Sequence, residues 1–367
     1  MSAMVSARAI TGARKGGGAL RRSKGCRSIT GVPARAQQQQ RVLVGSTTSG
    51  NHASIGLHTA QQLAARGHRV VLALAGELPE DEAAMGPPVM YFESHLRQQS
   101  GVSVVWAGSE FDALSDVLHE GSFNVIVDNN SKDSSSASPL LQLAKERHCA
   151  RYVFVSSCGI YKEATAVPLL EDDPIKPDTG QAEVEHLLHN DPDIGSFVSL
   201  RPQYPTGFGH VTRGDTFFFD RIFHNRTIPI PGTGEQVVNL CDASDLGNMA
   251  ALAAENGNAH NRAFNCVGER GVTLNGIAKL CAQAAGSEPN ILHYDPDKAG
   301  VDPKKAFPFR SGAHFFAEPR NAVELLGWRQ QHSLQSTLQN RWAEYKQIRD
   351  QSEVDFSMDD QIFTVAK

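Results

Sequence analysis

The sequence predicts an α/β protein built on a doubly wound parallel sheet, with a smaller C-terminal α/β lobe. Three observations lead to this fold class. Short apolar runs of strand length alternate with segments of helical periodicity from residue 41 onward. The first run ends in a glycine-containing turn, and polar residues follow the later runs. No segment approaches the ~18 continuous apolar residues of a membrane helix, so no membrane span is expected.

Residues 1–36 differ from the rest in composition. They hold eight of the 35 basic residues, none of the 40 acidic ones, and many Ser, Ala and Gly. This composition is typical of a disordered organelle transit peptide; a basic tail that touches nucleic acid is the alternative. The remaining chain carries a formal charge of −13, with His counted as neutral. A protein this acidic would bind RNA only through a local basic patch.

The first unit of the core is a strand, a turn, a helix and a second strand. The apolar run Val42–Val44 breaks at Gly45, and apolar positions then recur with helical spacing over 55–64. A second apolar run, 70–75, follows directly. The helix N-terminus is therefore aimed at the end of the first strand, where its backbone N–H groups suit a phosphate.

The turn matches the dinucleotide fingerprint imperfectly. Its spacing is Gly50-x-x-Ala53-x-x-Gly56, so alanine stands at the middle position, where glycine allows close backbone approach to a pyrophosphate. The candidate cofactor-binding residues are Gly45, Gly50, Ala53 and Gly56, and NAD(P) is the ligand they would take. A glycine turn that merely packs the helix on the strand is the alternative.

Polar side chains follow the fourth predicted strand. The third strand is expected over 101–106 and the fourth over 123–127, followed by the polar stretch 128–133. Because the carboxyl ends of parallel strands face the ligand crevice, Asp128 and Asp133 are candidate ligands for a divalent cation such as Mg²⁺ and candidate catalytic residues. A turn capped by its own Asn and Asp side chains is the alternative.

A helix over 139–147 and a fifth strand over 152–157 come next, and the strand runs into Cys158–Lys162. Further motifs follow in order at 200–202, 207–209, 229–234, 241–246 and 263–266. Together they resemble the extended short-chain dehydrogenase/reductase superfamily, which includes the NAD-dependent epimerases and dehydratases. The resemblance implies a Rossmann-like nucleotide-binding core over 41–200 and a C-terminal lobe over 201–350 that is interleaved with it.

The proton-transfer residues of that superfamily are missing. Its enzymes use a Tyr-x-x-x-Lys pair, in which the lysine lowers the pKa of the tyrosine. If Glu185 aligns with the glutamate that follows the lysine, the pair falls on Pro177 and Gln181, and neither side chain can transfer the proton. Conventional hydride-transfer chemistry is therefore not expected.

A narrower resemblance covers the chain from about residue 41 nearly to its end. Its motifs include Asn129-Asn130, Ser156–Lys162, Arg201–Tyr204, Phe218–Arg221, Pro229–Gly232, Phe264–Val267, His293–Pro296 and Lys304–Phe307. They are similar to the chloroplast stem-loop-binding proteins, plastid RNA-binding members of the superfamily. This resemblance implies a protein of the chloroplast stroma that binds stem-loop mRNA or rRNA and can cut it with a divalent metal. It also implies contact with the plastid ribosome and transcription machinery, and homo-oligomers or hetero-oligomers with a paralogue.

One stretch of the lobe combines cations with aromatic residues. Cations neutralise phosphates while aromatic rings stack on unpaired bases, so the candidate RNA-binding residues are Lys304, Lys305, Phe307 and Arg310. The alternative is that the phenylalanines belong to the core of the lobe and the lysines to a solvated face. A second cationic stretch, over 213–226, surrounds aromatic residues that are expected to pack inward.

The end of the chain carries fewer signals. Asp242 and Asp245 are expected to cap a helix over 246–254 rather than to bind metal. A final amphipathic helix is expected over 334–349, followed by an acidic tail over 351–367. Two other functions stay open: an NAD(P)-dependent nucleotide-sugar epimerase or reductase with its proton shuttle elsewhere, and a non-catalytic ribosome-associated subunit.

Overall fold

The computed structural model describes residues 38–50, 52–80, 86–96, 99–114, 118, 121–210, 213–348 and 354–365, apart from the side chain of Glu93. The chain divides into two compact units, Met1–Gln38 and Gln39–Lys367. The predicted transit peptide lies outside the described residues, so the architecture below is that of the second unit.

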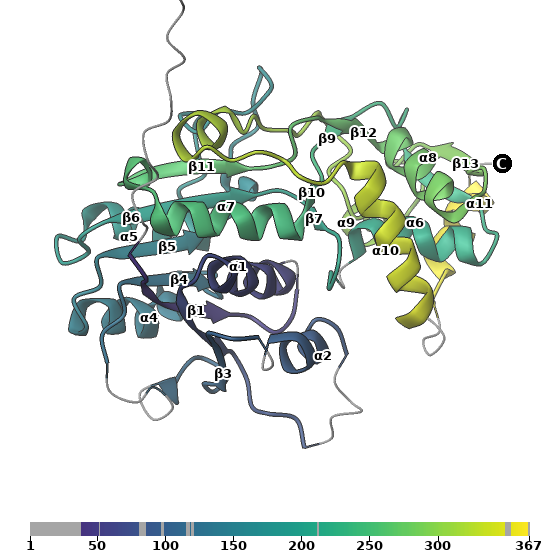
Figure 1. Ribbon diagram of the computed structural model, residues 1–367. Coiled ribbons are helices and arrows are strands. Elements are labelled where there is room, and N and C mark those ends of the chain that lie inside the picture. Colours follow the sequence, from purple (N-terminus) through teal and green to yellow (C-terminus); the bar gives the residue numbers. More distant parts are fainter. Residues whose placement is uncertain are drawn as a thin grey trace, which may run out of the picture. The chain divides into compact units, whose positions relative to one another are not determined.

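The core of this unit is a seven-stranded sheet in which all neighbouring strands are parallel (Figure 1). The strand order is β11-β6-β5-β4-β1-β2-β3. The bounds of the strands are β1 Arg41–Ser46, β2 Arg69–Leu74, β3 Val102–Trp106, β4 Val125–Asn129, β5 Arg151–Val155, β6 Phe197–Pro202 and β11 Arg262–Cys266. The order reverses between β1 and β4, which is the switch point of a doubly wound sheet. The predicted fold class is confirmed.

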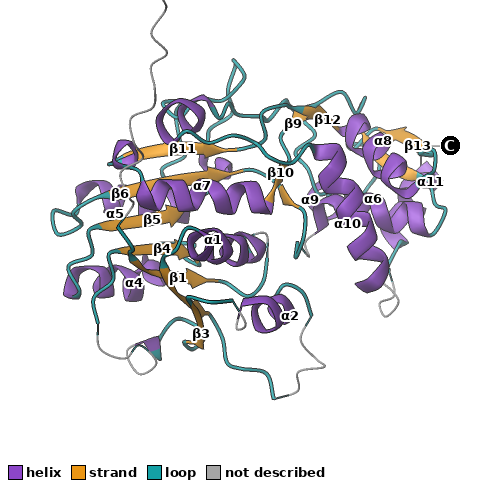
Figure 2. Cartoon of the chain, viewed as in Figure 1, coloured by secondary structure: helices purple, strands orange, loops and turns teal. Residues whose placement is uncertain are grey.

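Helices cover both faces of the sheet, as Figure 2 shows. The first face carries α1 (Ala53–Ala65) and α7 (Ala243–Glu255), and the opposite face carries α4 (Ser134–Glu146) and α5 (Gly180–Asn190). The alternation of strand side chains explains the division. In β1, Val42 and Val44 pack with α1 and α7, whereas Leu43 packs with α4 and α5.

The two helices of the first face pack closely against each other. A Cβ atom at Gly247 of α7 would lie 2.6 Å from the carbonyl carbon of His58 in α1, closer than side chains tolerate. Glycine at this position therefore permits the contact. Asp242 caps α7 as predicted, since its Oδ1 accepts the Ser244 N–H at 2.8 Å. Asp245 instead accepts the N–H groups of Gln331 and His332, and so holds a later loop.

The C-terminal lobe has a core of its own. Three short strand pairs belong to it: β8 (Ile228–Pro231) with β13 (Ile291–Tyr294), β7 (Pro205–Thr206) with β10 (Cys241–Asp242), and β9 (Val237–Val238) with β12 (Val272–Thr273). Its helices are α6 (Arg213–Phe223), α8 (Leu274–Ala285), α9 (Pro303–Ala306), α10 (Leu334–Ile348) and α11 (Ser357–Val365). The lobe is interleaved with the sheet, because β11 and α7 lie between its segments in sequence.

Short helical segments complete the described elements: α2 (Val89–Tyr91), η2 (Phe92–Leu96), η3 (Cys158–Ile160), η4 (Gly257–Ala259) and η5 (Ala322–Leu326). Among the helices in the described ranges, none combines the length and apolar composition of a membrane span.

The described part of the predicted acidic tail is a packed helix. In α11, Ile362 is buried, and the buried Asp359 carboxylate accepts a hydrogen bond from Arg221 Nη2 at 2.6 Å. Asp360 forms an ion pair with Arg226. Within the predicted acidic tail, residues 357–365 therefore form a helix whose acidic side chains pair with arginines of the second cationic stretch.

Candidate nucleotide and nucleic-acid site

Three pockets lie along the crevice that follows the carboxyl ends of the parallel strands. We call them the turn pocket, the edge pocket and the lobe pocket, with volumes of about 360, 220 and 260 Å³. The edge and lobe pockets share Tyr204 and Pro205. The turn and edge pockets are close enough for the charge of Lys132, which lines the first, to act on His52, which lines the second.

The turn pocket is lined by hydroxyl groups, by one cation and by the carboxylates of Glu110 and Asp133. Thr47, Thr48 and Ser49 come from the turn after β1, and Lys132 follows β4. Gly50 closes this turn with φ of +78°, and no heavy atom lies within 4 Å of where its Cβ would stand. The backbone conformation, rather than a lack of space, therefore favours glycine here.

The other three candidate cofactor residues lie deeper. A Cβ atom at Gly56 would come within 2.0 Å of Ser46 Oγ, so Gly56 allows α1 to pack on β1. Gly45 has the same role toward α4, because its Cβ would lie 2.7 Å from Leu140 Cδ1. Ala53 is buried as the first residue of α1. Cofactor contact by this set stays a prediction.

Asp128 and Asp133 stabilise local structure. Asp128 is 0% exposed: its Oδ2 accepts the Tyr152 hydroxyl at 2.7 Å, and its Oδ1 accepts the N–H groups of Asn130 and Ser131, both at 3.0 Å. Burial raises the pKa of the Asp128 carboxyl. Asp133 caps α4 by accepting the Ser136 N–H at 2.9 Å.

These contacts give Asp128 and Asp133 structural roles, and their metal-binding and catalytic roles stay predictions. In the ranges that the structure describes, no three His, Cys, Asp or Glu side chains converge to hold a metal ion. The alternative that the sequence offered, a turn stabilised by its own polar side chains, describes this segment.

The segment that aligns with the proton-transfer pair of the superfamily makes structural contacts. Pro177 is exposed in the loop before α5, and Gln181 lies in the first turn of that helix. Glu185 of α5 instead forms a buried ion pair with Arg201, with oxygen–nitrogen distances of 2.6 and 3.1 Å. The Tyr161 hydroxyl accepts from Arg201 Nη1 at 2.9 Å and donates to Asn265 Oδ1 at 2.6 Å. Burial raises the pKa of Tyr161 far above its usual range, so this hydroxyl is no substitute acid.

The edge pocket places a neutral histidine next to the turn. Burial, with a smaller contribution from Lys132, lowers the pKa of His52 to about 4. The wall also contains Gln203, whose Oε1 accepts the Asn239 N–H at 2.8 Å. Gln203 and Tyr204 were missed as site residues in the sequence. Their signal is a polar and an aromatic side chain directly after β6, at the carboxyl edge of the sheet.

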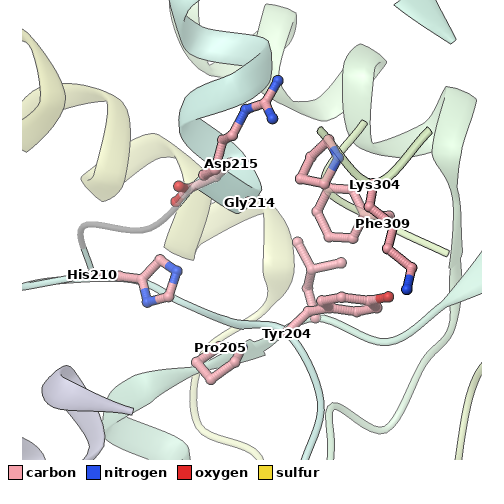
Figure 3. A pocket seen from close by; sticks show the side chains of 10 residues that line it. Tyr204, Pro205, His210, Gly214, Asp215, Lys304 and Phe309 are labelled. Atoms are coloured by element: carbon pink, nitrogen blue, oxygen red, sulfur yellow. The ribbon is translucent and has the colours of Figure 1, made fainter. Parts of the chain in front are cut away.

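Tyr204 is the aromatic residue that lines both the edge pocket and the lobe pocket. Its φ is +38°, and its hydroxyl accepts the Arg310 N–H at 2.9 Å. Figure 3 shows Tyr204, Lys304 and Phe309 on one side of the lobe pocket, with His210 and Asp215 across from them. Burial lowers the pKa of His210 to about 4, so a neutral ring lines this wall at neutral pH.

The structure separates the four predicted RNA-binding residues. Lys304 and Lys305 are exposed on α9, and Arg310 is half-buried with its guanidinium 4.3 Å from the centre of the Phe315 ring. Phe307 is only 3% exposed and packs edge-to-face on Phe217, with ring centres 5.2 Å apart. The predicted base-stacking role of Phe307 is corrected, because a ring in the lobe core is not available to RNA.

A further cation joins the exposed lysines. Arg213 of α6 donates hydrogen bonds to the carbonyls of Lys305 and Ala306, which fixes it beside α9. We call Arg213, Lys304, Lys305 and Arg310 the lobe rim. Three of them, Arg213, Lys304 and Lys305, are exposed cations on a chain that is acidic outside its first 36 residues.

The parallel sheet with a glycine turn at its switch point defines a fold of the Rossmann type. Residues 48–267 match the NAD dependent epimerase/dehydratase family, and the chain belongs to that family. It is also 29% identical over 344 residues to the chloroplast stem-loop binding protein of 41 kDa b from Arabidopsis thaliana, covering 90% of this chain and 85% of that protein. This confirms the resemblance predicted from the motifs.

Solved structures share the fold at low identity. An epimerase from Methanothermobacter thermautotrophicus superposes with a TM-score of 0.68 at 16% identity, over 87% of this chain and 97% of that one. The dTDP-glucose 4,6-dehydratase from Bacillus anthracis, solved in complex with NAD, gives 0.66 at 14%, over 85% and 98%. The UDP-glucose 4-epimerase from Thermotoga maritima, solved with UDP-glucose, gives 0.63 at 19%, over 84% and 100%.

Proposed function

We propose that this protein binds stem-loop RNA in the chloroplast through the lobe rim, and that it is not a hydride-transfer enzyme. The proposal rests on a difference between the two ends of the crevice: the proton-transfer residues are missing at one end, and cations are exposed at the other. The positions expected to hold the Tyr–Lys pair are Pro177 and Gln181, while exposed cations gather around a tyrosine at the other end. Similarity over 90% of the chain to a protein named for stem-loop binding supports the same function.

Electrostatics favours the lobe rim as the contact. Lysine and arginine side chains that neutralise phosphates release counterions, which makes the affinity strongly dependent on salt. Lys304 and Lys305 have no carboxylate partner among the ion pairs of the described residues, so their charges are available. By contrast, Arg221 and Arg226 pair with α11.

The finer parts of the proposal follow from the family resemblance. They are a stromal location, an mRNA or rRNA target, contact with the plastid ribosome, and homo-oligomers or hetero-oligomers with a paralogue. In these contacts the protein would support plastid RNA metabolism, translation and transcription. Cutting of the RNA with a divalent metal also follows from the resemblance alone. The described residues hold no cluster of three metal ligands that would support it, so a titration with and without Mg²⁺ is the test.

An NAD(P)-dependent epimerase or reductase is the second candidate, and the turn pocket favours it. Its position at the switch point fits a dinucleotide, and Thr47, Thr48, Ser49 and Lys132 are the residues that would hold the phosphates. NAD(P) would supply hydride transfer. The chain offers no proton donor at Pro177 or Gln181, and the Tyr161 hydroxyl is buried between Arg201 and Asn265. These residues therefore favour binding of the dinucleotide without catalysis over a complete hydride-transfer reaction.

Titration of a fluorescently labelled stem-loop RNA tests the proposal. The full chain and a form lacking residues 1–36 are compared across a salt series, with and without Mg²⁺, so that the basic leader cannot account for binding. We expect salt-sensitive binding by both forms, and RNA fragments only if the protein is also a nuclease. Absence of binding at low salt, together with NAD(P)-dependent turnover of UDP-glucose, would favour the enzyme instead.

A further inference from the structure

The edge and lobe pockets are each the size of a single ring system. Their volumes, about 220 and 260 Å³, fall below the ~300–1,000 Å³ typical of pockets for drug-sized ligands. Both are lined by Tyr204 and Pro205, so one aromatic side chain borders two adjoining recesses. This geometry suits a planar group that lies against the tyrosine.

The Tyr204 ring is held in place by its surroundings. Its hydroxyl is fixed by the Arg310 N–H, and Phe309 and Phe315 meet its ring edge-to-face with ring centres 4.7 and 6.3 Å apart. A φ of +38° is sparsely populated for a bulky residue, and such conformations persist where neighbouring contacts determine them. Tyr204 is therefore a preorganised platform that loses little conformational freedom on binding.

The edge pocket also contains a polar group suited to a base edge. Gln203 is 3% exposed and lines the pocket. Its Oε1 is satisfied by Asn239, whereas its Nε2 has no hydrogen-bond partner in the part of the chain that the structure describes. A buried amide donor of this kind matches the carbonyl and ring-nitrogen acceptors of a nucleobase.

Cations stand where the phosphates of such a nucleotide would lie. Lys304 and Arg213 line the lobe pocket, and Arg310 lines the edge pocket. The acidic residue in the lobe pocket, Asp215, does not oppose them freely. Its Oδ2 lies 3.2 Å from Arg341 Nε and accepts the Thr206 hydroxyl at 2.7 Å.

We propose that an unpaired nucleotide of the RNA inserts its base against Tyr204, so that these pockets bind the loop of a stem-loop rather than its stem. The inference rests on the proposed RNA-binding function and specifies the part of the RNA that is bound. The stem contributes phosphates to Lys304 and Lys305, and the loop contributes at least one base to the crevice. Bases stack on aromatic rings with little dependence on sequence, so the pockets select unpaired RNA over duplex.

Two variants of the full chain separate the ring from its hydroxyl. Tyr204→Leu removes the aromatic face, and Tyr204→Phe keeps it while removing the acceptor of the Arg310 N–H. Binding is measured to a stem-loop and to a blunt duplex of the same stem. We expect Tyr204→Leu to bind the stem-loop roughly tenfold more weakly and the duplex unchanged, since one base–aromatic stack is lost. Tyr204→Phe should bind both RNAs within about twofold of wild type.

A fluorescent base in the loop gives a measurement that needs no variant. Stacking of 2-aminopurine on Tyr204 should change its fluorescence when wild-type protein saturates the RNA. Equal weakening of stem-loop and duplex by Tyr204→Leu, or an unchanged signal at every loop position, would overturn the inference while leaving RNA binding intact. If wild-type protein binds neither RNA, the proposed function itself fails.

Discussion

The two ends of the crevice use their polar residues in opposite ways. At the sheet end, the carboxylates of Asp128, Asp133 and Glu185 are all engaged by other groups of the chain. At the lobe end, Lys304 and Lys305 extend from α9 into solvent. A charged residue type does not by itself tell whether the charge is paired after folding. The difference shows that a site is defined by which charges are left available after folding.

Burial explains the difference. The carboxylates of Asp128 and Glu185 are buried inside the unit, where an unpaired charge costs free energy. Both therefore pair with other groups of the chain. The helix α9 has four residues and an exposed outer face, so its lysines are under no such constraint.

The largest expected effect is at the sheet end, where Arg201→Met would leave the buried Glu185 carboxylate without its partner. We expect a loss of about 3–5 kcal/mol in the free energy of unfolding, measured by urea denaturation. The double variant Arg201→Met/Glu185→Leu should recover much of it, because no charge is then left buried. A loss below about 1 kcal/mol in the single variant would show that the pair is not structural.

Two histidines, the partly buried His52 and the buried His210, predict a pH dependence of stability in the middle of the crevice. His52 and His210 have a folded pKa of about 4, against the usual 6.5 in the unfolded chain. The unfolded state binds the proton more tightly, so this stability is complete above pH 6.5 and is lost as the pH falls toward 4. By pH 5 the loss is about 2 kcal/mol per histidine.

Urea midpoints of wild type and His52→Gln at pH 7 and pH 5 measure this effect. The variant should lose less stability between the two pH values, by about 2 kcal/mol. Identical losses in both proteins would mean that the pKa of His52 is the same in the folded and the unfolded chain.

At the lobe end we expect a smaller effect, on binding and not on stability. Lys304→Ala/Lys305→Ala should lower RNA affinity several-fold at about 0.1 M salt and reduce the slope of log affinity against log salt by about one. The matched control is Arg69→Ala/Arg262→Ala, which removes two exposed cations from the amino ends of β2 and β11. If the control variant weakens RNA binding as much, the RNA responds to the overall charge of the protein and the lobe rim is not its specific contact.

The smallest effect is expected at Arg226, which pairs with the exposed Asp360 of α11. An exposed ion pair contributes at most ~1 kcal/mol, so Arg226→Ala should shift the unfolding midpoint only slightly. RNA affinity should not change, because α11 already occupies this arginine. A clear loss of affinity in the fluorescence titration would move the RNA contact from the lobe rim to the segment that follows α6.

The sequence was sufficient for the fold because hydrophobic periodicity reports burial directly. The runs at 42–44, 70–75 and 123–127 became β1, β2 and β4. The absence of the Tyr–Lys pair was inferred from the superfamily resemblance, with Glu185 as the point of alignment. The site was harder to predict. Asp128 and Phe307 have the residue types of functional groups, yet Tyr152 and Phe217, distant in sequence, engage them. Tyr204 was missed for the converse reason: its place directly after β6 was the only local signal, and the two pockets that its ring borders are completed by residues distant in sequence.

Photocrosslinking tests the central claim most directly. A stem-loop RNA with a photoactivatable thiouridine in its loop is bound to the full chain and irradiated, and the crosslinked peptides are identified by mass spectrometry. The account predicts crosslinks to the segment around Tyr204 and to α9 with the residues up to Arg310. Crosslinks confined to the turn after β1 and the segment after β4 would contradict it, because the RNA would then occupy the dinucleotide end of the crevice.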